Sequence, residues 1–398
     1  MLNRIVYEIF NTDVLVIGSG ATGMRAAIEA AKKGVNVTLI NKGYFGKSGS
    51  TLLADADIAI DSKSAINLFN LPGNMEDNPE LFFEDIVIEG EYLNNQRLVE
   101  IHVSEAPYRL KQLVEWGAKI QKLVKSPGHK YPRGVWILGT EINRVLKKEL
   151  NKNKNINIFE HLIILDFVID EENNQVSGAI GLNLVRGIFY LFKTKAIIIC
   201  TGGAMRLYSS TTAPEELTGD GFAIAYRVGV ELVDMEFPMF LPYTMISPQY
   251  LKGSIFPYDL SAYFEVKALN VKGERYMKKW DPERLEKSSR DINSVAAAIE
   301  ILEGRGTPRG GTYLSLKGIK DNLMTCSKKC LNNVQSKIWG YGGFNLKEFL
   351  SNLTEKTLET APACHYWNGG IKIDEKCETN IRGLYAAGEV TGGYTWSE

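Results

Sequence analysis

The sequence predicts an α/β protein built on a Rossmann-type dinucleotide-binding domain, with a smaller α+β domain inserted into it. Three observations predict this fold. A glycine-rich turn joins a strand to a helix near the N-terminus, strand patterns return at 156–200 and 371–390, and a proline-rich, irregular stretch separates those two regions. The 398 residues suffice for one large or two medium domains.

The first element is a βαβ unit. Asp13–Ile17 is a short apolar strand, and Met24–Lys33 has helical periodicity with alanines along one face. Gly34 ends that helix, and Val35–Ile40 forms a second strand. Because the helix crosses from one strand to the next, the two strands are expected to lie in a parallel sheet.

The rest of the chain falls into blocks. Residues 80–150 have a mostly helical pattern, residues 156–200 have strand patterns with a turn at 171–174, and residues 219–235 are again helical. Six prolines interrupt residues 236–355. We therefore expect a discontinuous cofactor domain, 1–237 and 356–398, with a cap or substrate domain at 238–355.

Composition excludes several classes of partner. Lys and Arg number 46 against 47 for Asp and Glu, so no global charge favours nucleic acid. No apolar run approaches the ~20 residues that span a bilayer, and charges interrupt the N-terminus, so we expect a cytoplasmic protein without a transmembrane segment. The five cysteines contain no C-x-x-C, and the pair Cys326 and Cys330 is weak evidence for a metal, so no metal is expected.

The glycine-rich turn has the spacing of a dinucleotide-binding motif, G-x-G-x-x-G. In such a motif the first glycine permits the tight turn, the second lets the backbone approach a pyrophosphate, and the third lets the helix pack on the strand. The second strand ends in Asn41 and Lys42 rather than in an acid, so this motif alone leaves NAD and FAD open. The motif comprises Gly18, Ser19, Gly20, Ala21, Thr22 and Gly23.

Further segments carry a family resemblance, in the family's order, from residue 13 to 393. They are Thr201-Gly202-Gly203, Thr218-Gly-Asp220-Gly, Ser289-Arg290-Asp291, His365-Tyr366 followed by Gly-Gly-Ile, and Gly388-Glu389. The sequence resembles the FAD-dependent flavoprotein subunits of succinate dehydrogenase and fumarate reductase, with L-aspartate oxidase and the alpha chain of adenylylsulfate reductase among their relatives. The resemblance implies a Rossmann-type FAD-binding domain with an inserted α+β cap domain.

The resemblance also implies FAD as cofactor and a set of residues around it. Asp220 and Glu389 suit hydroxyl groups of FAD; the alternatives are a helix N-cap for Asp220 and a solvated turn for Glu389. Ser50 stands where membrane-bound relatives link FAD to a histidine, so a non-covalent FAD is expected. Besides the glycine motif, the expected FAD-binding residues are Asn41, Lys42, Ser48, Gly49, Ser50, Thr51, Thr201, Gly202, Gly203, Asp220, Tyr366, Gly388 and Glu389.

For catalysis, the resemblance implies hydride exchange between FAD and a small carboxylate-type substrate. Arg290 is the candidate for proton transfer, and the alternative is an ion pair with Asp291 or Glu286. His365 is the candidate substrate contact, whereas His102, His129 and His161 are expected to be structural.

The sequence also departs from the family. Leu241 stands in place of a substrate-binding histidine, and an acidic and basic segment that follows it in the family has no counterpart. The aromatic residues in this region favour another substrate: Tyr243, Tyr250, Phe256, Tyr258, Tyr263 and Phe264. Family members continue beyond the position of Glu398, so we expect a further segment or a second polypeptide to complete the FAD site.

Two alternatives therefore stay open beside a reductase of the fumarate type. One is a catalytically incomplete flavin-binding electron-transfer subunit that needs a partner chain. The other is an adenylylsulfate-reductase-like enzyme. A disulfide reductase is rejected, because there is no redox cysteine pair. The expected partners are a small-molecule substrate and an iron–sulfur or other electron-transfer subunit, through which the protein would lie peripheral to a membrane.

Overall fold

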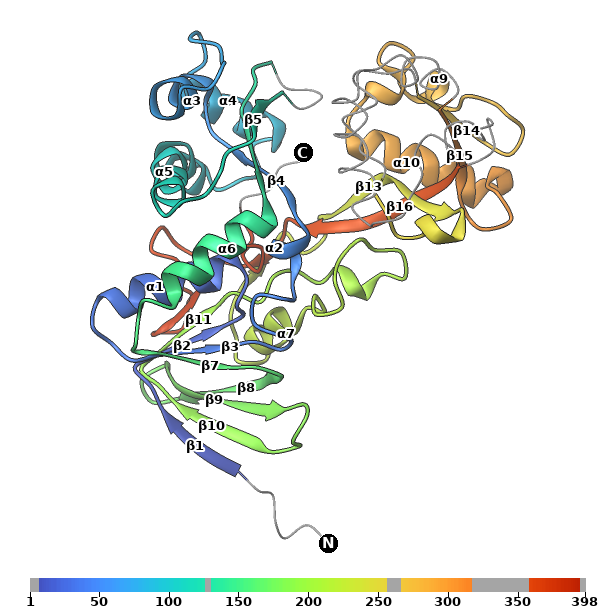
Figure 1. Ribbon diagram of the computed structural model, residues 1–398. Coiled ribbons are helices and arrows are strands. Elements are labelled where there is room, and N and C mark those ends of the chain that lie inside the picture. Colours follow the sequence, from blue (N-terminus) through green and yellow to red (C-terminus); the bar gives the residue numbers. More distant parts are fainter. Residues whose placement is uncertain (1–6, 126–129, 256–265, 317–357, 394–398) are drawn as a thin grey trace, which may run out of the picture.

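The computed structural model describes residues 7–125, 130–255, 266–316 and 358–393 (Figure 1). At its centre lies a five-stranded sheet in which every neighbouring pair of strands is parallel. This confirms the predicted α/β fold class with its parallel sheet. In spatial order the strands are β18 (Leu384–Ala386), β11 (Ala196–Ile199), β2 (Val14–Ile17), β3 (Val37–Ile40) and β7 (Ile156–Phe159).

The βαβ unit is present, and its helix begins earlier than the sequence indicated. Helix α1 (Ala21–Lys32) starts inside the glycine motif, because Gly20 is its N-cap in an extended conformation. The helix ends before Gly34, whose φ of +84° suits glycine. Small residues among those on its buried face let it pack closely on the sheet. The buried residues are Gly23, Met24, Ala27, Ile28 and Ala31.

Alternate residues of β2 face two different cores. Val16 packs with α1 and with α6 (Gly139–Leu150), whereas Leu15 and Ile17 pack against a second sheet. The turn expected at 171–174 joins two antiparallel strands of that sheet. Its four strands, in spatial order, are β1 (Tyr7–Asn11), β10 (Phe189–Lys193), β9 (Gln175–Asn183) and β8 (Leu162–Asp170).

The block at 80–150 is only partly helical. It contains α4 (Pro79–Glu89), α5 (Gln96–Glu115) and α6, preceded by α3 (Ser62–Phe69). A small antiparallel sheet was not predicted, because its short apolar runs cannot be distinguished from helix by periodicity. In spatial order its strands are β4 (Asp55–Ala59), β6 (Gly134–Leu138) and β5 (Lys122–Val124).

A buried ion pair joins the helical block to this small sheet. The Arg133 guanidinium donates to Asp77 through Nε, at 3.0 Å to Oδ2, and through its second terminal nitrogen, at 2.7 Å to Oδ1. Both side chains are almost fully buried, and Arg133 also donates to Asp85 Oδ2 at 2.6 Å, so removal of Arg133 would leave the buried Asp77 carboxylate uncompensated. Because β6 leads directly into α6, this pair fixes the segment that packs against the glycine motif.

The inserted region has its own antiparallel sheet and core, as the α+β prediction states. Helix α10 (Arg290–Glu300) packs on this sheet, and the short α9 (Met277–Trp280) lies nearby. Pro242 lies where the register of the first strand shifts, the kind of position a strand proline tolerates. In spatial order the strands are β13 (Pro238–Ser247), β16 (Leu358–Trp367), β15 (Thr312–Ser315) and β14 (Lys267–Leu269).

Strand β16 lies wholly after the expected domain boundary at 355/356. It belongs to the return segment by sequence, yet it pairs with β13 and β15 of the inserted region. After β16 the chain returns through β17 (Gly370–Ile371), which pairs with β12 (Leu232–Val233), and reaches β18. The division into 1–237, 238–355 and 356–398 stays a prediction, and β16 physically connects the two parts.

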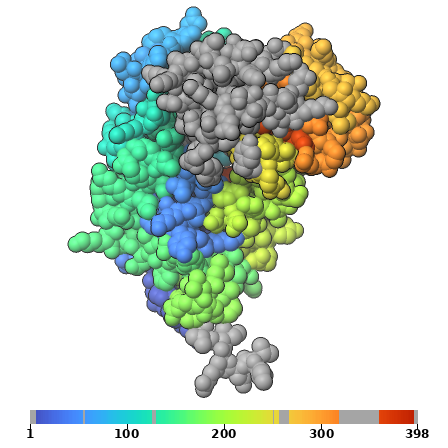
Figure 2. Space-filling model, turned by 45° about the vertical axis from the view of Figure 1, so that its right-hand side comes forward, coloured from blue at the N-terminus to red at the C-terminus, as the bar shows by residue number. Residues whose placement is uncertain are grey.

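The helical block and the inserted cap stand on opposite sides above the parallel sheet (Figure 1), and both are prominent in the space-filling view (Figure 2). Within the described ranges, none of the helices is long and apolar enough to cross a membrane. The same part of the chain holds no cluster of three His, Cys, Asp or Glu residues suited to a metal. Cys326, Cys330 and His129 lie outside the described residues.

His102 makes the stability of the fold sensitive to acid. Burial of this α5 residue, whose ring lies edge-on to Phe82, lowers its pKa from 6.5 to about 4. As the pH falls, the histidine of the unfolded chain is protonated near pH 6.5, whereas that of the folded chain is protonated only near pH 4. The free energy of unfolding is therefore undiminished above pH 6.5 and decreases between pH 6.5 and pH 4.

In the natural protein, His102 should lower the free energy of unfolding by on the order of 2 kcal/mol between pH 7 and pH 4, and His102→Leu should remove this decrease. The measurement is the urea midpoint of both proteins at a series of pH values between 7 and 4. Equal slopes for the two proteins would contradict the assignment.

Candidate functional site

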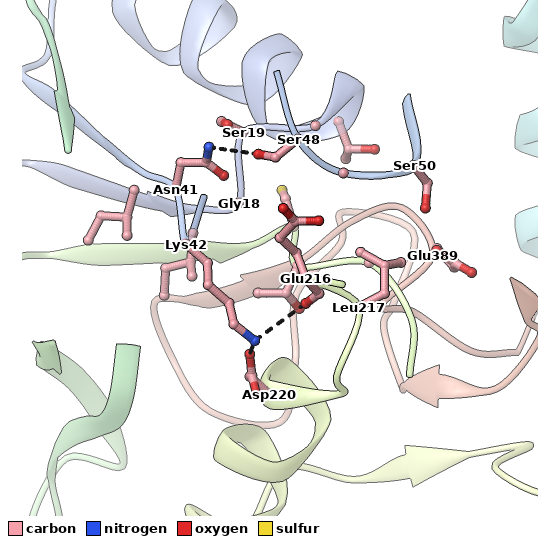
Figure 3. A pocket seen from close by; sticks show the side chains of 18 of the residues that line it. Gly18, Ser19, Asn41, Lys42, Ser48, Ser50, Glu216, Leu217, Asp220 and Glu389 are labelled. Carbon is pink, nitrogen blue, oxygen red and sulfur yellow. Dashed lines mark hydrogen bonds and ion pairs between the residues drawn. The ribbon is translucent and has the colours of Figure 1, made fainter. Parts of the chain in front are cut away.

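A pocket of about 940 Å³, part of it open to solvent, lies at the carboxyl ends of β2, β3 and β11 (Figure 3). Ligands of open α/β sheets bind at this edge. The glycine motif, the end of β3, the turn before α2 (Ser50–Leu53), the start of β8 and the segments around Thr201, Asp220 and Glu389 line it. Segments far apart in sequence thus meet around one elongated cavity.

The glycines of the motif are required for different reasons. A Cβ on Gly18 would lie 2.1 Å from the Cys200 carbonyl oxygen, and its φ is +102°; a Cβ on Gly23 would lie 1.8 Å from the Gly18 oxygen. The fold itself therefore requires glycine at positions 18 and 23. A Cβ on Gly20 meets only Thr51 Oγ1, at 3.3 Å. The space above Gly20 is left open by the protein, as a closely approaching ligand would need.

The N-terminus of α1 is available to an anion. Its first turn holds no acidic residue, and the N-cap Gly20 has no side chain with which to bond the helix. Thr51 Oγ1 accepts from the Ala21 N–H at 2.9 Å, which ties α2 to the start of α1. The positive end of the helix dipole thus faces the pocket, where phosphate groups bind favourably.

The end of β3 contributes two polar side chains. Asn41 donates from Nδ2 to Ser48 Oγ at 3.2 Å, and Lys42 Nζ donates to Asp220 Oδ2 at 2.7 Å (Figure 3). Lys42 Nζ also donates to Thr218 Oγ1 at 2.6 Å. Helix α7 (Asp220–Arg227) has Gly219 as its N-cap, so Asp220 does not cap the helix. Its carboxylate faces the pocket instead, held by Lys42.

Glu389 lines the pocket and is held there by hydrogen bonds, so it does not lie in a solvated turn. Its carboxylate accepts from the Gly203 N–H at 3.1 Å and from the Trp367 N–H at 3.2 Å. Burial raises the pKa of this carboxyl, and the two backbone hydrogen bonds oppose that shift. Next to it, a Cβ on Gly388 would lie 2.5 Å from Thr22 Oγ1, so this turn closes directly on the glycine motif.

The residues present fit a dinucleotide cofactor. The space left open above Gly20 and the N-terminus of α1 suit a pyrophosphate, and the carboxylates of Asp220 and Glu389 suit hydroxyl groups. Of the predicted cofactor residues, the following line the pocket: Gly18, Ser19, Gly20, Ala21, Thr22, Asn41, Lys42, Ser48, Gly49, Ser50, Thr51, Thr201, Gly202, Asp220 and Glu389.

Four predicted cofactor residues lie outside the pocket wall. Gly23, Gly203 and Gly388 support lining residues, and Tyr366 lies beside His365 with 5.8 Å between the ring centroids. Other lining residues were missed, because apolar residues at a strand start resemble any core residue. These are Leu162, Ile163 and Ile164 on β8, with Ile17, Ile40, Cys200, Glu216, Leu217, Ile224 and Ala387.

The structure brings the two predicted catalytic residues, Arg290 and His365, within electrostatic reach of each other. Arg290 begins α10, and His365 lies on β16. The pKa of His365 is lowered to about 4, foremost by burial and further by the positive charge of Arg290. The imidazole is therefore neutral at pH 7. Neither residue lines the cofactor pocket itself.

Glu286 does not serve as the acidic partner proposed for Arg290 in the alternative interpretation. Its carboxylate is almost fully buried and accepts from Arg275 Nε at 3.0 Å and from the Ala268 N–H at 2.8 Å. Arg275 therefore already neutralises this carboxylate.

Tyr243 is one of the aromatic residues that favoured another substrate in the sequence. Tyr243 is buried in the core of the cap and donates to Asn293 Oδ1 at 2.6 Å, so it does not face a substrate. The register shift between Leu241 and Thr244 changes which residues point inward. Phe256, Tyr258, Tyr263 and Phe264 lie outside the described residues, as does the side chain of Tyr250.

The three cysteines in the described residues are free thiols: Cys200, Cys364 and Cys377. Burial raises the pKa of Cys200 and of Cys364 to about 12, so both are protonated at neutral pH. A protonated thiol is a poor nucleophile, and the rejection of a disulfide reductase is consistent with this chemistry.

Comparisons with known proteins identify the family. Residues 13–398 match the FAD binding domain family. The chain is 36% identical to an uncharacterized FAD-dependent oxidoreductase of Methanocaldococcus jannaschii, covering 96% of this chain and 67% of that protein. It is 33% identical to one of the subunits of the fumarate reductase (CoM/CoB) of Methanothermobacter marburgensis, covering 97% and 68%.

The fold leads to the same family. The FrdA chain of E. coli quinol fumarate reductase superimposes with a TM-score of 0.80 at 26% identity, covering 98% of this chain and 67% of that one. The chain thus spans about two thirds of the length of these relatives. The resemblance inferred from the motifs is confirmed: the chain belongs to the FAD binding domain family and is an FAD-dependent oxidoreductase related to the flavoprotein subunits of fumarate reductase and succinate dehydrogenase.

Proposed function

We propose that this protein reduces the carbon–carbon double bond of a small unsaturated carboxylate, as a fumarate reductase does. FAD supplies the hydride when it is bound. The observation that carries the proposal is that Arg290 on α10 lies near enough to His365 on β16 for its positive charge to lower the pKa of the imidazole. A fixed cation beside a neutral imidazole suits a substrate that carries carboxylate groups and gains a proton.

The chain's own residues would hold the cofactor at both ends of the pocket. The open space above Gly20 and the N-terminus of α1 favour the pyrophosphate. Asp220 and Glu389 offer carboxylate oxygens to hydroxyl groups, and Lys42 orients Asp220. Ser50, at the start of α2, would lie against the flavin.

Arg290 and His365 would act on the substrate. The Arg290 guanidinium would bind a carboxylate and pass a proton to the substrate carbon, and it would regain a proton from solvent after the product leaves. The neutral His365 imidazole donates one N–H to a carboxylate oxygen. Closure of the cap over the substrate would exclude water and strengthen both interactions.

An electron-transfer partner is part of the proposal. The M. marburgensis relative is named as one subunit of an enzyme, and this chain holds no cluster of metal-ligating residues in its described part. We therefore propose that an iron–sulfur or other electron-transfer subunit delivers electrons, and that any membrane association occurs through such a partner.

The test is a panel of electron acceptors offered to the purified protein in anaerobic steady state, with reduced viologen dye or the thiols CoM and CoB as donor. Fumarate should be reduced, and adenylylsulfate should not. Turnover with adenylylsulfate alone would favour the adenylylsulfate-reductase-like alternative. FAD binding without turnover of any acceptor would favour an electron-transfer subunit.

The FAD is expected to be non-covalent, because Ser50 cannot form the link that a histidine forms in the relatives. Acid precipitation should leave the yellow colour in the supernatant. The measurement is flavin fluorescence of the washed, denatured polypeptide on a gel. Fluorescence that migrates with the polypeptide would overturn this expectation.

A further inference from the structure

We propose that Thr212 is a positioning residue that fixes the tautomer of His365, so that its Nε2–H is presented to a substrate carboxylate. The inference rests on the proposed function, in which His365 contacts the substrate. It concerns a residue outside every motif that pointed to the cofactor. Its basis is a hydrogen bond of 2.7 Å between Thr212 Oγ1 and His365 Nδ1.

The hydroxyl is held rigidly relative to the imidazole. The segment that precedes Thr212 pairs with β16 as a short parallel bridge. The Thr212 N–H donates to the Cys364 carbonyl at 3.1 Å, Thr211 Oγ1 donates to the same oxygen at 3.0 Å, and the Cys364 N–H donates to Ser210 at 3.0 Å. Together with the bond to the ring, these hydrogen bonds connect this segment to residues 364 and 365.

The bond selects one tautomer. A neutral imidazole has one donor nitrogen and one acceptor nitrogen. The distance of 2.7 Å is typical of a hydroxyl donor and shorter than the usual N–H···O distance of about 2.9–3.0 Å, so we take Thr212 as the donor and Nδ1 as the acceptor. Donation by Thr212 makes Nδ1 the acceptor and places the ring proton on Nε2.

Nε2 is free to meet a ligand. Within the described residues its nitrogen makes no hydrogen bond, and it is not among the fully buried polar atoms without a partner, so solvent reaches it. The ring is held neutral by burial and by the charge of Arg290. A neutral ring with the proton on Nε2 is a hydrogen-bond donor towards a carboxylate oxygen.

The experiment compares Thr212→Val, which removes the hydroxyl at nearly constant volume, with Thr212→Ser, which retains it. The FAD-loaded protein carries ¹⁵N in its histidine rings, and His365→Asn identifies the His365 signals by their loss. We expect protonated Nε2 and unprotonated Nδ1 in the natural protein and in Thr212→Ser. In Thr212→Val the ring should populate both tautomers.

Kinetics supply the second readout. With fumarate as the probe and reduced viologen as donor, Thr212→Val should raise KM about tenfold, the effect of one hydrogen bond, with a smaller change in kcat. Thr212→Ser should restore KM. A proton on Nδ1 in the natural protein, or an unchanged tautomer and KM in Thr212→Val, would overturn the proposal. The NMR result needs no turnover, so it stands or falls separately from the proposed function.

Discussion

Replacing Arg290 by lysine is expected to lower turnover roughly 100- to 10,000-fold while FAD stays bound, because a placed proton donor contributes this much to a rate. The guanidinium is planar and always charged, and an ammonium on a flexible stem reproduces neither its geometry nor its two-point binding of a carboxylate. Arg290 does not line the cofactor pocket, so the flavin spectrum should not change. Viologen-linked reduction of fumarate is the measurement.

Arg284→Lys is the matched control. This arginine lies in the same cap, is largely exposed and donates from Nε to Asp281 at 2.8 Å. Asp281 is buried, but lysine keeps the positive charge at this exposed position, so turnover should stay unchanged. If Arg290→Lys kept its activity within a factor of three of the natural protein, Arg290 would have a structural role and no part in proton transfer.

Gly20→Val is expected to weaken FAD binding by about 100-fold or more without preventing folding. A branched side chain would fill the space that the protein leaves open at this position and that the pyrophosphate needs. Its one near neighbour is the Thr51 hydroxyl, which is a side-chain atom and can move aside. The measurements are the dissociation constant of FAD and the thermal midpoint of the FAD-free protein.

Gly23→Ala is the comparison variant, because it should destabilise the fold itself, whereas Gly20→Val should affect FAD binding. Its Cβ would lie 1.8 Å from the Gly18 backbone oxygen, so this change should lower the thermal midpoint of the FAD-free protein. Gly20→Val should leave that midpoint nearly unchanged. If Gly20→Val purified with a full complement of FAD, the pyrophosphate would have to lie elsewhere in the pocket.

The sequence was most informative where backbone geometry restricts the residue type. A strand, a G-x-G-x-x-G turn and an alanine-rich helix allow few alternatives, and β2, α1 and β3 follow in the predicted order, although α1 begins three residues before the predicted start at Met24. The acidic residues Asp220 and Glu389 were found because their motifs are family-specific, and both line the pocket.

Other parts of the site depend on tertiary contacts that no local pattern records. The β4–β6–β5 sheet forms from short apolar runs, and Leu162–Ile164 line the pocket only because β8 begins beside β3. Tyr243 was among the aromatic residues that favoured another substrate, and it lies in the core of the cap, at a register shift in β13. Thr212 meets His365 across 153 residues of sequence, so only the structure could reveal that contact.

The central claim is that FAD bound to this protein passes its electrons to an unsaturated carboxylate. It is tested most directly by reducing the FAD-loaded protein with one equivalent of dithionite without oxygen and mixing it rapidly with fumarate. The account predicts that the flavin absorbance returns in one phase and that one succinate forms per FAD. Reduced flavin that persists with fumarate, although it is reoxidised by a viologen dye, would contradict the account.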